Sequence, residues 1–225
     1  MSMAIHVNTY IVRQEFLIDN ATSITLLNVD ENVARINVDI IPSDQRMDIG
    51  QYRIRRDSEK RLIARSFLYE SVRERFGVQN FDLGFGVYEK PFLKNYPDIH
   101  FSLSYSKDFI LVGVSQGRRI GVDIEYNDQV LDVREIAPDI MCAPELAYFC
   151  SRPGDVEQRR FFFDLFSRKE SIIKAYGTGL YFPVRDLNIL GPQFFSNQGM
   201  VFECSPLNTC LSNSYSFAIC REVSA

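Results

Sequence analysis

The most constraining feature of this sequence is a group of three strand-like stretches between residues 100 and 125. They are His100 to Ser104, Phe109 to Gln116 and Arg119 to Glu125. In the last stretch, Gly121, Asp123 and Glu125 alternate with apolar residues. Because successive side chains of a strand point to opposite faces, Asp123 and Glu125 share a face, about 6.5 Å apart. Both carboxylates could therefore reach one hard divalent cation. The alternative is an edge strand whose polar face is solvated.

Two long amphipathic helices are predicted on either side of this group. Ser58 to Phe76 has an apolar side, a cap at Asp57 or Ser58, and Gly77 just past its end. Val156 to Tyr176 is closed by Gly177 in the same way. Each helix is long enough to cover a sheet.

The rest of the chain is predicted mainly as strands. Alternating residues predict strands in Ile24 to Val29, in Val33 to Ile41, and again beyond Val184. Asp82 to Pro97 is expected to be loop-rich, and one short helix is expected near Pro144. The order of elements favours an α+β fold with a boundary near Gly117, which divides the chain into residues 1–117 and 118–225.

Composition narrows the class of protein. Hydrophobic residues make up 46% and charged residues 24% of the 225, as in an ordinary globular protein. The net charge of −4 argues against a surface that grips nucleic acid. Five cysteines without a C-x-x-C pair indicate neither a disulfide framework nor a zinc site. No leader pattern and no apolar run of about 18 residues is found, so we expect a cytoplasmic protein without a membrane anchor.

The charge is unevenly distributed. Between Arg46 and Arg75 there are nine basic and five acidic residues, while the rest of the chain is strongly acidic. This basic patch suits a small polyanion such as a nucleotide. The alternative is the solvated face of an amphipathic helix.

The second predicted helix carries a carboxylate on its apolar side. Glu170 falls between Phe163 and Phe166 on the helical wheel, with Lys174 one turn further on. An exposed Glu–Lys pair at this spacing gains only about 0.3 to 0.5 kcal/mol, whereas burying a carboxylate costs several kcal/mol. A metal ion shared with Asp123 and Glu125 would account for all three acids. Oxygen ligands favour Mg²⁺ or Mn²⁺, and with the basic patch they suggest phosphoryl-type chemistry on a nucleotide-like ligand.

Four short motifs together resemble a known family. They are I-G-V-D-I-E at Ile120–Glu125, F-S-R-K-E-S-I-I-K at Phe166–Lys174, Lys90-Pro91, and F-S-L-S-Y-S at Phe101–Ser106. Their order and spacing are similar to those of the 4'-phosphopantetheinyl transferases of the longer, Sfp-type branch. The resemblance covers Tyr88 to Leu180.

The resemblance implies an enzyme that moves the phosphopantetheine arm of coenzyme A onto a serine of an apo acyl or peptidyl carrier protein and releases 3',5'-ADP. It implies an α+β pseudo-dimer of two similar halves with the active site between them. Coenzyme A and the carrier are then the expected partners, with no nucleic acid or membrane, and a monomer is expected.

The resemblance also implies residue roles. Asp123, Glu125 and Glu170 would bind Mg²⁺ with the pyrophosphate of coenzyme A. Glu170, Lys174 and Glu145 would be catalytic, Lys174 at the leaving phosphate and Glu145 as acceptor of the serine proton. The expected contacts to phosphates of coenzyme A are Lys90, Ser104, Tyr105, Arg61 and Arg46.

One departure from the family pattern bears on these contacts. Tyr105 stands where the family has histidine, and Ser102 where it has asparagine. A tyrosine can donate a hydrogen bond to phosphate but brings no positive charge. Two further functions therefore stay open: a non-catalytic coenzyme A or carrier-binding homologue, and a metal-dependent nucleotide phosphohydrolase.

Overall fold

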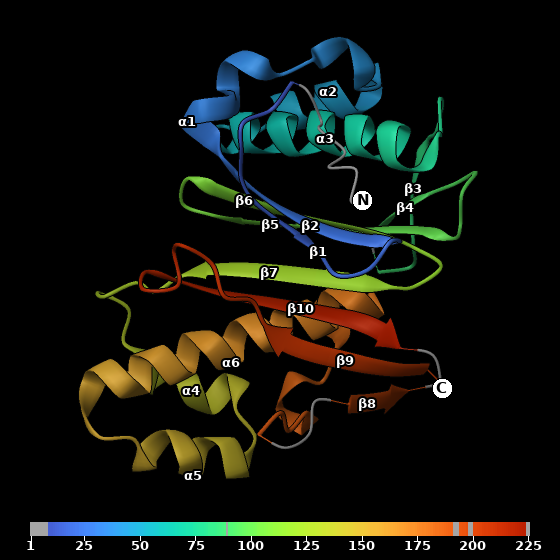
Figure 1. The fold of residues 1–225 in the computed structure, drawn as a ribbon. Helices are drawn as coiled ribbons and strands as arrows, with labels where there is room; N and C mark the ends of the chain where they lie inside the picture. Colours follow the sequence, from blue (N-terminus) through green and yellow to red (C-terminus); the bar gives the residue numbers. More distant parts are fainter. Residues whose placement is uncertain (1–8, 89, 191–193, 198–199, 224–225) are drawn as a thin grey trace.

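The computed structural model describes residues 9–88, 90–190, 194–197 and 200–223. Two four-stranded antiparallel sheets lie between two long helices (Figure 1). The N-terminal sheet has the order β1-β2-β6-β5, from Val12–Leu17, Thr22–Asn28, Phe109–Gln116 and Ile99–Ser106. The C-terminal sheet has the order β7-β10-β9-β8, from Ile120–Tyr126, Tyr215–Val223, Met200–Pro206 and Phe194–Asn197. A two-stranded hairpin pairs β3 (Leu83–Phe85) with β4 (Pro91–Leu93).

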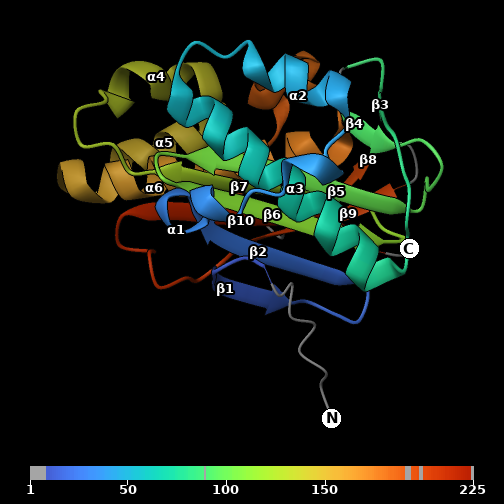
Figure 2. The same ribbon diagram turned by 90° about the horizontal axis from the view of Figure 1, so that it is seen from above.

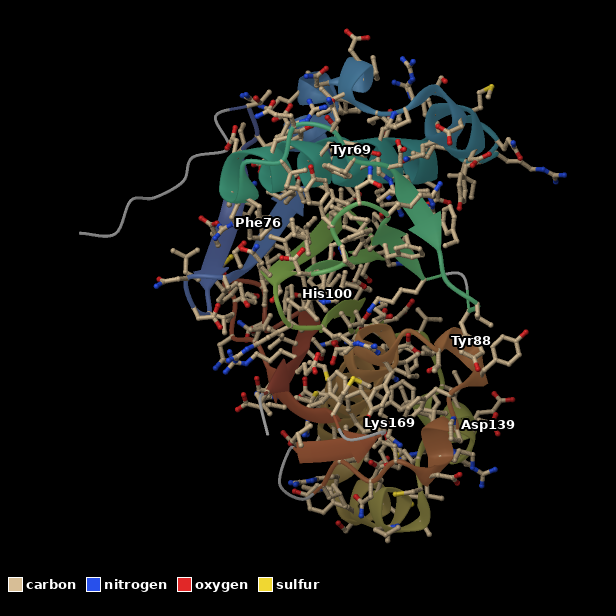
Figure 3. All side chains as sticks on the ribbon, turned by 90° about the vertical axis from the view of Figure 1, so that its right-hand side faces the viewer. Tyr69, Phe76, Tyr88, His100, Asp139 and Lys169 are labelled. Carbon is tan, nitrogen blue, oxygen red and sulfur yellow. The ribbon has the colours of Figure 1, made fainter. Side chains whose placement is uncertain are left out.

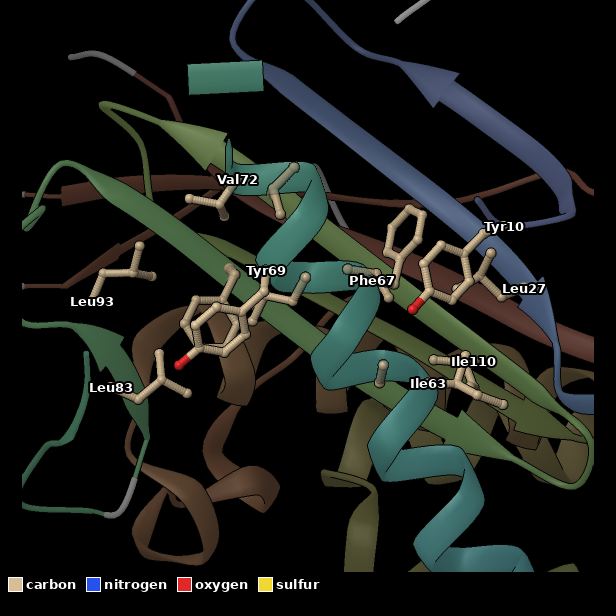
Figure 4. Close-up of a cluster of buried hydrophobic side chains, with 14 of the residues drawn as sticks. Tyr10, Leu27, Ile63, Phe67, Tyr69, Val72, Leu83, Leu93 and Ile110 are labelled. Atoms are coloured by element: carbon tan, nitrogen blue, oxygen red, sulfur yellow. The ribbon is translucent and has the colours of Figure 1, made fainter. Parts of the chain in front are cut away.

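Helix α3 (Arg55–Phe76) covers the outer face of the N-terminal sheet, as Figure 2 shows from above. Its apolar side packs with Tyr10, Leu27 and Ile110 into one core cluster (Figure 4). Gly77 ends the helix in the left-handed conformation at φ +67°, as predicted. The preceding segments are short: α1 (Val29–Asn32), α2 (Ser43–Gly50), and two 3-10 turns, η1 (Val33–Arg35) and η2 (Val38–Ile40).

Helix α6 (Gly154–Tyr176) covers the outer face of the C-terminal sheet and ends at Gly177, also left-handed at φ +81°. Helices α4 (Val133–Ile140) and α5 (Ala143–Ser151) pack beside it and share its core cluster. Two 3-10 turns follow, η3 (Gly179–Tyr181) and η4 (Val184–Asp186). No helix in the described part of the chain is both long and apolar enough to cross a membrane.

The inner faces of the two sheets form a third core cluster. It joins Ile24, Leu26 and Leu111 of the N-terminal sheet to residues of β7 and β10, among them Ile120, Val122 and Ile124. Since these three residues of β7 point toward the N-terminal sheet, strand alternation turns Gly121, Asp123 and Glu125 toward α6. The predicted shared face of the two carboxylates is therefore confirmed.

Serine side chains connect β5 to β7, two strands that belong to different sheets. The hydroxyl oxygens of Ser102, Ser104 and Ser106 accept hydrogen bonds from the backbone N–H groups of Val122, Ile124 and Tyr126, at 3.0, 3.3 and 2.8 Å. Side-chain hydroxyls thus replace a backbone ladder along this seam. The seam fixes the position of Asp123 relative to the N-terminal sheet.

Two local predictions were wrong. The strand predicted in Val33 to Ile41 is instead the pair of turns η1 and η2, because Ile36 and Ile40 pack against the core cluster under α3 rather than pairing with a strand. The short helix expected near Pro144 is confirmed as α5, which begins at Ala143, and a second helix that was not predicted, α4, begins before it at a cap formed by Asp132. The predicted cap residues Asp57 and Ser58 lie inside α3, which begins at Arg55. Residues 1–8, on which part of the leader expectation depends, lie outside the described residues.

Candidate active site

A buried ion pair joins β7 to α6. Lys174 Nζ lies 2.6 Å from Asp123 Oδ1 and 2.8 Å from the hydroxyl of Ser104, which itself donates to Asp123 Oδ1 at 2.8 Å. Asp123 is 1% exposed. Lys174 therefore pairs with Asp123 from the neighbouring strand, rather than with Glu170 one turn away on its own helix.

A glycine allows the helix to approach the strand this closely. A Cβ atom at Gly121 would lie 2.0 Å from the backbone oxygen of Ser171 and 2.5 Å from the nitrogen of Ala175. Both atoms are rigid helix backbone, so no larger residue fits without moving α6. The G-V-D spacing of the first motif thus places the helix directly over Asp123.

The three acids predicted as metal ligands influence one another electrostatically. Burial raises the pKa of Glu125 to about 8, and the negative charges of Asp123 and Glu170 add to this rise while Lys174 opposes it. The pKa of Glu170 is likewise raised, first by burial and then by Asp123. We call Asp123, Glu125 and Glu170 the carboxylate cluster. Its members repel one another in a partly desolvated site.

The carboxylate cluster has the donor chemistry of a hard-cation site. Oδ2 of Asp123 is buried and has no hydrogen-bond partner among the described residues. An orphaned carboxylate oxygen beside two acids of raised pKa is a site that a cation would stabilise. Within the described ranges, however, no three acidic, histidine or cysteine side chains are already gathered closely enough to hold a metal ion.

A cavity of about 310 Å³ adjoins this cluster between the β3–β4 hairpin, β5 and α6. Its lining includes Lys90, Phe101, Leu103, Glu170, Ile173 and Lys174. Tyr88 also lines it and contacts Tyr181 from the C-terminal region, with ring centroids 5.3 Å apart. Figure 3 shows Tyr88 where the two regions of the molecule meet. The cavity thus has mainly apolar walls, and one carboxylate and two amines also line it.

Lys90 is bound to the end of α6. Its Nζ donates to the backbone oxygens of Lys174 and Ala175, at 2.5 and 3.2 Å. Burial, helped by the charge of Arg119, lowers the pKa of Lys90 to about 8. An amine at a helix C-terminus satisfies free carbonyls and complements the helix dipole. Lys90 was predicted as a phosphate contact; here it fastens the hairpin to the helix that carries Lys174.

Glu145 lies in a structural ion pair. It is fully buried, and its Oε2 lies 2.6 Å from Nζ of Lys169, which is fully buried as well. Its two oxygens also accept the backbone N–H groups of Cys142 and Ile189. A carboxylate with both oxygens bound and no exposure has no free position for a substrate hydroxyl, which opposes its predicted role as acceptor of the serine proton.

Ser104 is similarly occupied. Its hydroxyl donates to Asp123 and accepts from Lys174 and from the N–H of Ile124, and the residue is 3% exposed. One donor and two acceptor positions are all that a hydroxyl offers. The predicted phosphate contact through Ser104 is therefore opposed by the structure, which makes Ser104 a holder of the Asp123–Lys174 pair.

The basic patch divides into paired and unpaired side chains. Arg55, Arg56 and Lys60 form ion pairs with nearby acids. The guanidinium of Arg61 instead lies 3.8 Å from the ring centre of Tyr52 and 5.4 Å from that of Tyr105. Arg46 is exposed on α2. Arg61 and Tyr105 are thus brought together, as their shared predicted role requires, and Arg46 lies on a separate helix.

Sequence reasoning missed two sets of residues that shape the site. Ser102 and Ser106 belong to the seam, and their spacing of two on a strand was the available signal. Lys169 lies in the second motif, and the sequence assigns it no role. Its partners, Glu145 and the backbone oxygens of Ile140 and Val184, lie 15 to 29 residues away along the chain, where no local pattern could show them.

Comparison with known proteins supports the family resemblance that the four motifs indicate. Residues 119–220 match the family model of the 4'-phosphopantetheinyl transferase superfamily. The chain is 26% identical over 151 residues to 4'-phosphopantetheinyl transferase Sfp of Bacillus subtilis, covering 66% of each chain. It is 27% identical over 164 residues to the psf-1 transferase of Bacillus pumilus, covering 70% of this chain and 69% of that one.

A more distant relative is the L-aminoadipate-semialdehyde dehydrogenase-phosphopantetheinyl transferase of Mus musculus, 25% identical over 187 residues, which cover 78% of this chain and 56% of the relative. Strand β7 and helix α6, which carry the first and second motifs, lie within the region that the family model matches. Over residues 119–220 the chain is similar to the 4'-phosphopantetheinyl transferase superfamily, and over about two thirds of its length it is similar to Sfp-like transferases.

Proposed function

We propose that this protein transfers the 4'-phosphopantetheine arm of coenzyme A to a serine of an apo acyl or peptidyl carrier protein and releases 3',5'-ADP. The observation that carries the proposal is the meeting of Asp123, Lys174 and Glu170 beside one cavity. These residues come from the two signature motifs, 41 positions apart at their nearest ends.

The proposal includes a pseudo-dimeric architecture with halves 1–117 and 118–225. It is supported by the two sheets, each of which draws all its strands from one side of Gly117. Each sheet is also covered by one long helix that ends at a left-handed glycine. The cavity lies between these halves, with β5 on one side and α6 on the other.

Asp123, Glu125 and Glu170 would hold Mg²⁺, or Mn²⁺, in this proposal. The orphaned Oδ2 of Asp123 and the mutual repulsion of the three acids support it. A divalent ion there would neutralise the pyrophosphate as charge shifts to the leaving group. Lys174, 28% exposed at the same point, would donate a hydrogen bond or a proton to the leaving phosphate through its Nζ.

Glu170 is the member of the carboxylate cluster that lines the cavity, which supports a role as acceptor of the proton of the carrier serine. Burial and then Asp123 raise the pKa of Glu170. Arg61, Tyr105 and Arg46 would contact phosphates of coenzyme A. Lys90 and Ser104 would act by positioning α6 and Lys174. Glu145 has no part in the chemistry, because both its oxygens are bound.

Intact-protein mass spectrometry tests the proposal directly. The enzyme is incubated with coenzyme A, Mg²⁺ and a panel of apo acyl, peptidyl and aryl carrier proteins. At least one carrier should gain the mass of one phosphopantetheine group, and 3',5'-ADP should form in equal amount. Unchanged masses across the whole panel would refute the proposal.

Tyr105 in place of the family histidine favours a second candidate, a non-catalytic homologue that binds coenzyme A or a carrier. The same panel separates the two. Tight binding of coenzyme A with no transfer to any carrier would select the binding protein. Modification of more carrier than there is enzyme, which requires more than one turnover, would exclude the binding protein.

A further inference from the structure

A second cavity, of about 210 Å³, adjoins the cavity of the candidate active site and shares Lys90 and Gly177 with it. It lies between the β3–β4 hairpin, the first residues of β5, the residue before β7 and the end of α6. Three basic side chains line it, Lys90, His100 and Arg119, and no carboxylate of a described residue does. Figure 3 shows His100 near the middle of the molecule, where the two regions meet. We call this second space the basic cavity.

The three basic side chains keep hydrogen-bond donors that no described residue uses. The guanidinium of Arg119 and the imidazole of His100 have no hydrogen-bond partner within the described ranges. Lys90 Nζ donates to two carbonyl oxygens of α6, at 2.5 and 3.2 Å, which leaves one of its three N–H groups. Burial, and then the charges of Lys90 and Arg119, lower the pKa of His100. These groups therefore repel one another, and an anion bound among them would relieve the repulsion.

Two acids act on His100 from outside the lining of the basic cavity. Asp98 and Glu222 partly oppose the fall in the pKa of His100, but neither forms an ion pair with a side chain of the cavity. The carboxylate of Asp98 is bound by a glutamine of β6 at 3.1 Å, and that of Glu222 accepts the backbone N–H of Arg119 at 3.2 Å. Two carbonyls at the end of α6, which would repel an anion, are covered by Lys90. The cavity thus keeps unused donors and positive charge.

We propose that the basic cavity binds a small oxyanion of the phosphate type, held by Arg119, His100 and Lys90. The donors come from three separate elements around the cavity, an arrangement that suits the several oxygens of a phosphate better than the two of a carboxylate. Aromatic side chains line part of the remaining wall: Phe92, Phe101 and Tyr176. Free phosphate and a phosphate monoester with an apolar part share this chemistry. The site is separate from the carboxylate cluster, and binding there requires no transfer reaction.

Proton NMR of the imidazole of His100 tests this inference, because the chain has only two histidines. In a His6→Gln protein, inorganic phosphate added at constant ionic strength should move the His100 signals to saturation. It should also raise the pKa of His100, since an anion stabilises the charged imidazole. Arg119→Gln in this background should weaken phosphate binding about tenfold, the loss expected for a hydrogen bond between charged groups. Arg118→Gln removes the same charge from the adjacent residue, which does not line the cavity, and should leave phosphate binding unchanged.

Arg119→Lys keeps the test decisive if Arg119→Gln does not fold. It retains the charge without the planar pair of donors and should weaken phosphate binding about threefold. Phenyl phosphate separates the two sources of the anion: tighter binding than inorganic phosphate assigns the site to a monoester with an apolar part, and equal or weaker binding assigns it to free phosphate.

Three results would overturn the inference. They are His100 signals that do not respond to phosphate, unchanged phosphate affinity in the Arg119 variants, and displacement of the phosphate by coenzyme A, which would place the anion in the candidate active site. The first two leave the proposed function standing, because no carrier protein or transfer step enters the experiment.

Discussion

The two long helices of this protein end in the same way but serve different purposes. Gly77 and Gly177 both adopt the left-handed conformation, and each donates its N–H to the residue four positions earlier, at 3.0 and 2.9 Å. Around Gly77 a Cβ atom would meet nothing within 4 Å, whereas at Gly177 it would lie 2.7 Å from Lys90 Cδ. The first glycine only stops a helix. The second makes room for a lysine that joins the two regions.

The helices also meet their sheets differently. Helix α3 rests on the N-terminal sheet through large side chains such as Phe67 and Val72 (Figure 4). Helix α6 approaches β7 through Gly121, at backbone distance. In this arrangement Lys174 of the helix lies 2.6 Å from Asp123 of the strand. The proposed active site therefore lies under α6, and α3 adds basic side chains at its margin.

The largest effect is expected from a substitution that prevents the close approach of α6 to β7. Gly121→Ala places a methyl group against backbone atoms of Ser171 and Ala175, so α6 must move. We expect a loss of at least about 3 kcal/mol in the free energy of unfolding, measured by urea denaturation, together with loss of transfer. Gly50→Ala is the control, because that Cβ would meet no atom within 4 Å, and it should change stability by about 0.5 kcal/mol or less. A Gly121→Ala protein with wild-type stability would contradict the packing described here.

The next effect concerns the buried Glu145–Lys169 pair. Lys169→Met leaves a buried carboxylate without its cation and should cost about 3 to 5 kcal/mol of unfolding free energy. Replacing both residues, as Glu145→Gln with Lys169→Met, should recover part of that loss and retain transfer activity. If Glu145 accepted the serine proton, the double variant would fold but lose turnover, and the mass assay distinguishes these results.

The junction at Lys90 predicts a dependence on pH. Its folded-state pKa of about 8 lies below the ordinary lysine value of 10.5, so between these pH values the unfolded chain binds one more proton. Stability should therefore rise with pH across this window, by about 2 to 3 kcal/mol relative to Lys90→Met. Denaturation of both proteins at pH 7.5 and 10 measures the difference. Lys94→Met removes an exposed lysine just after β4 and keeps Lys90, so its stability should rise with pH as in the wild type. A rise of the same size in Lys90→Met would refute the assignment.

The smallest effect separates two serines of the seam. Ser104→Ala removes the hydroxyl that holds both Asp123 and Lys174, and it should lower turnover about tenfold and stability by about 1 to 2 kcal/mol. Ser106→Ala loses one comparable bond, to the N–H of Tyr126, without touching that pair. It should lose about 1 kcal/mol of stability and keep its turnover. Equal turnover in the two variants would remove the positioning role of Ser104.

The sequence predicted the parts of this molecule that repeat a local pattern. Strict alternation placed Asp123 and Glu125 on one face of β7, and helical periodicity with a terminal glycine located α3 and α6. The alternation in Val33 to Ile41 led to a wrong prediction of a strand. Apolar residues that alternate with polar ones can also lie in consecutive 3-10 turns that pack against a helix. Periodicity reports which residues are buried, and it does not report what covers them.

Partners distant in the chain could not be predicted in this way. Lys90 reaches the end of α6 across 84 residues, and Glu145 receives the N–H of Ile189 across 44. The family resemblance predicted catalytic or phosphate-binding roles for Lys90, Glu145 and Ser104. Such a prediction depends on residue types and contains no information on their contacts. Once the partners are visible, the positions divide into groups that hold the site together and groups that remain free to meet a substrate.

The most direct test of the account is transfer activity in Asp123→Ala and Glu170→Ala, measured by carrier mass with circular dichroism as a check on folding. Both variants should retain the wild-type spectrum and produce no modified carrier, since one acid comes from β7 and the other from α6. Substantial turnover in both folded variants would contradict the claim that these acids form one catalytic site.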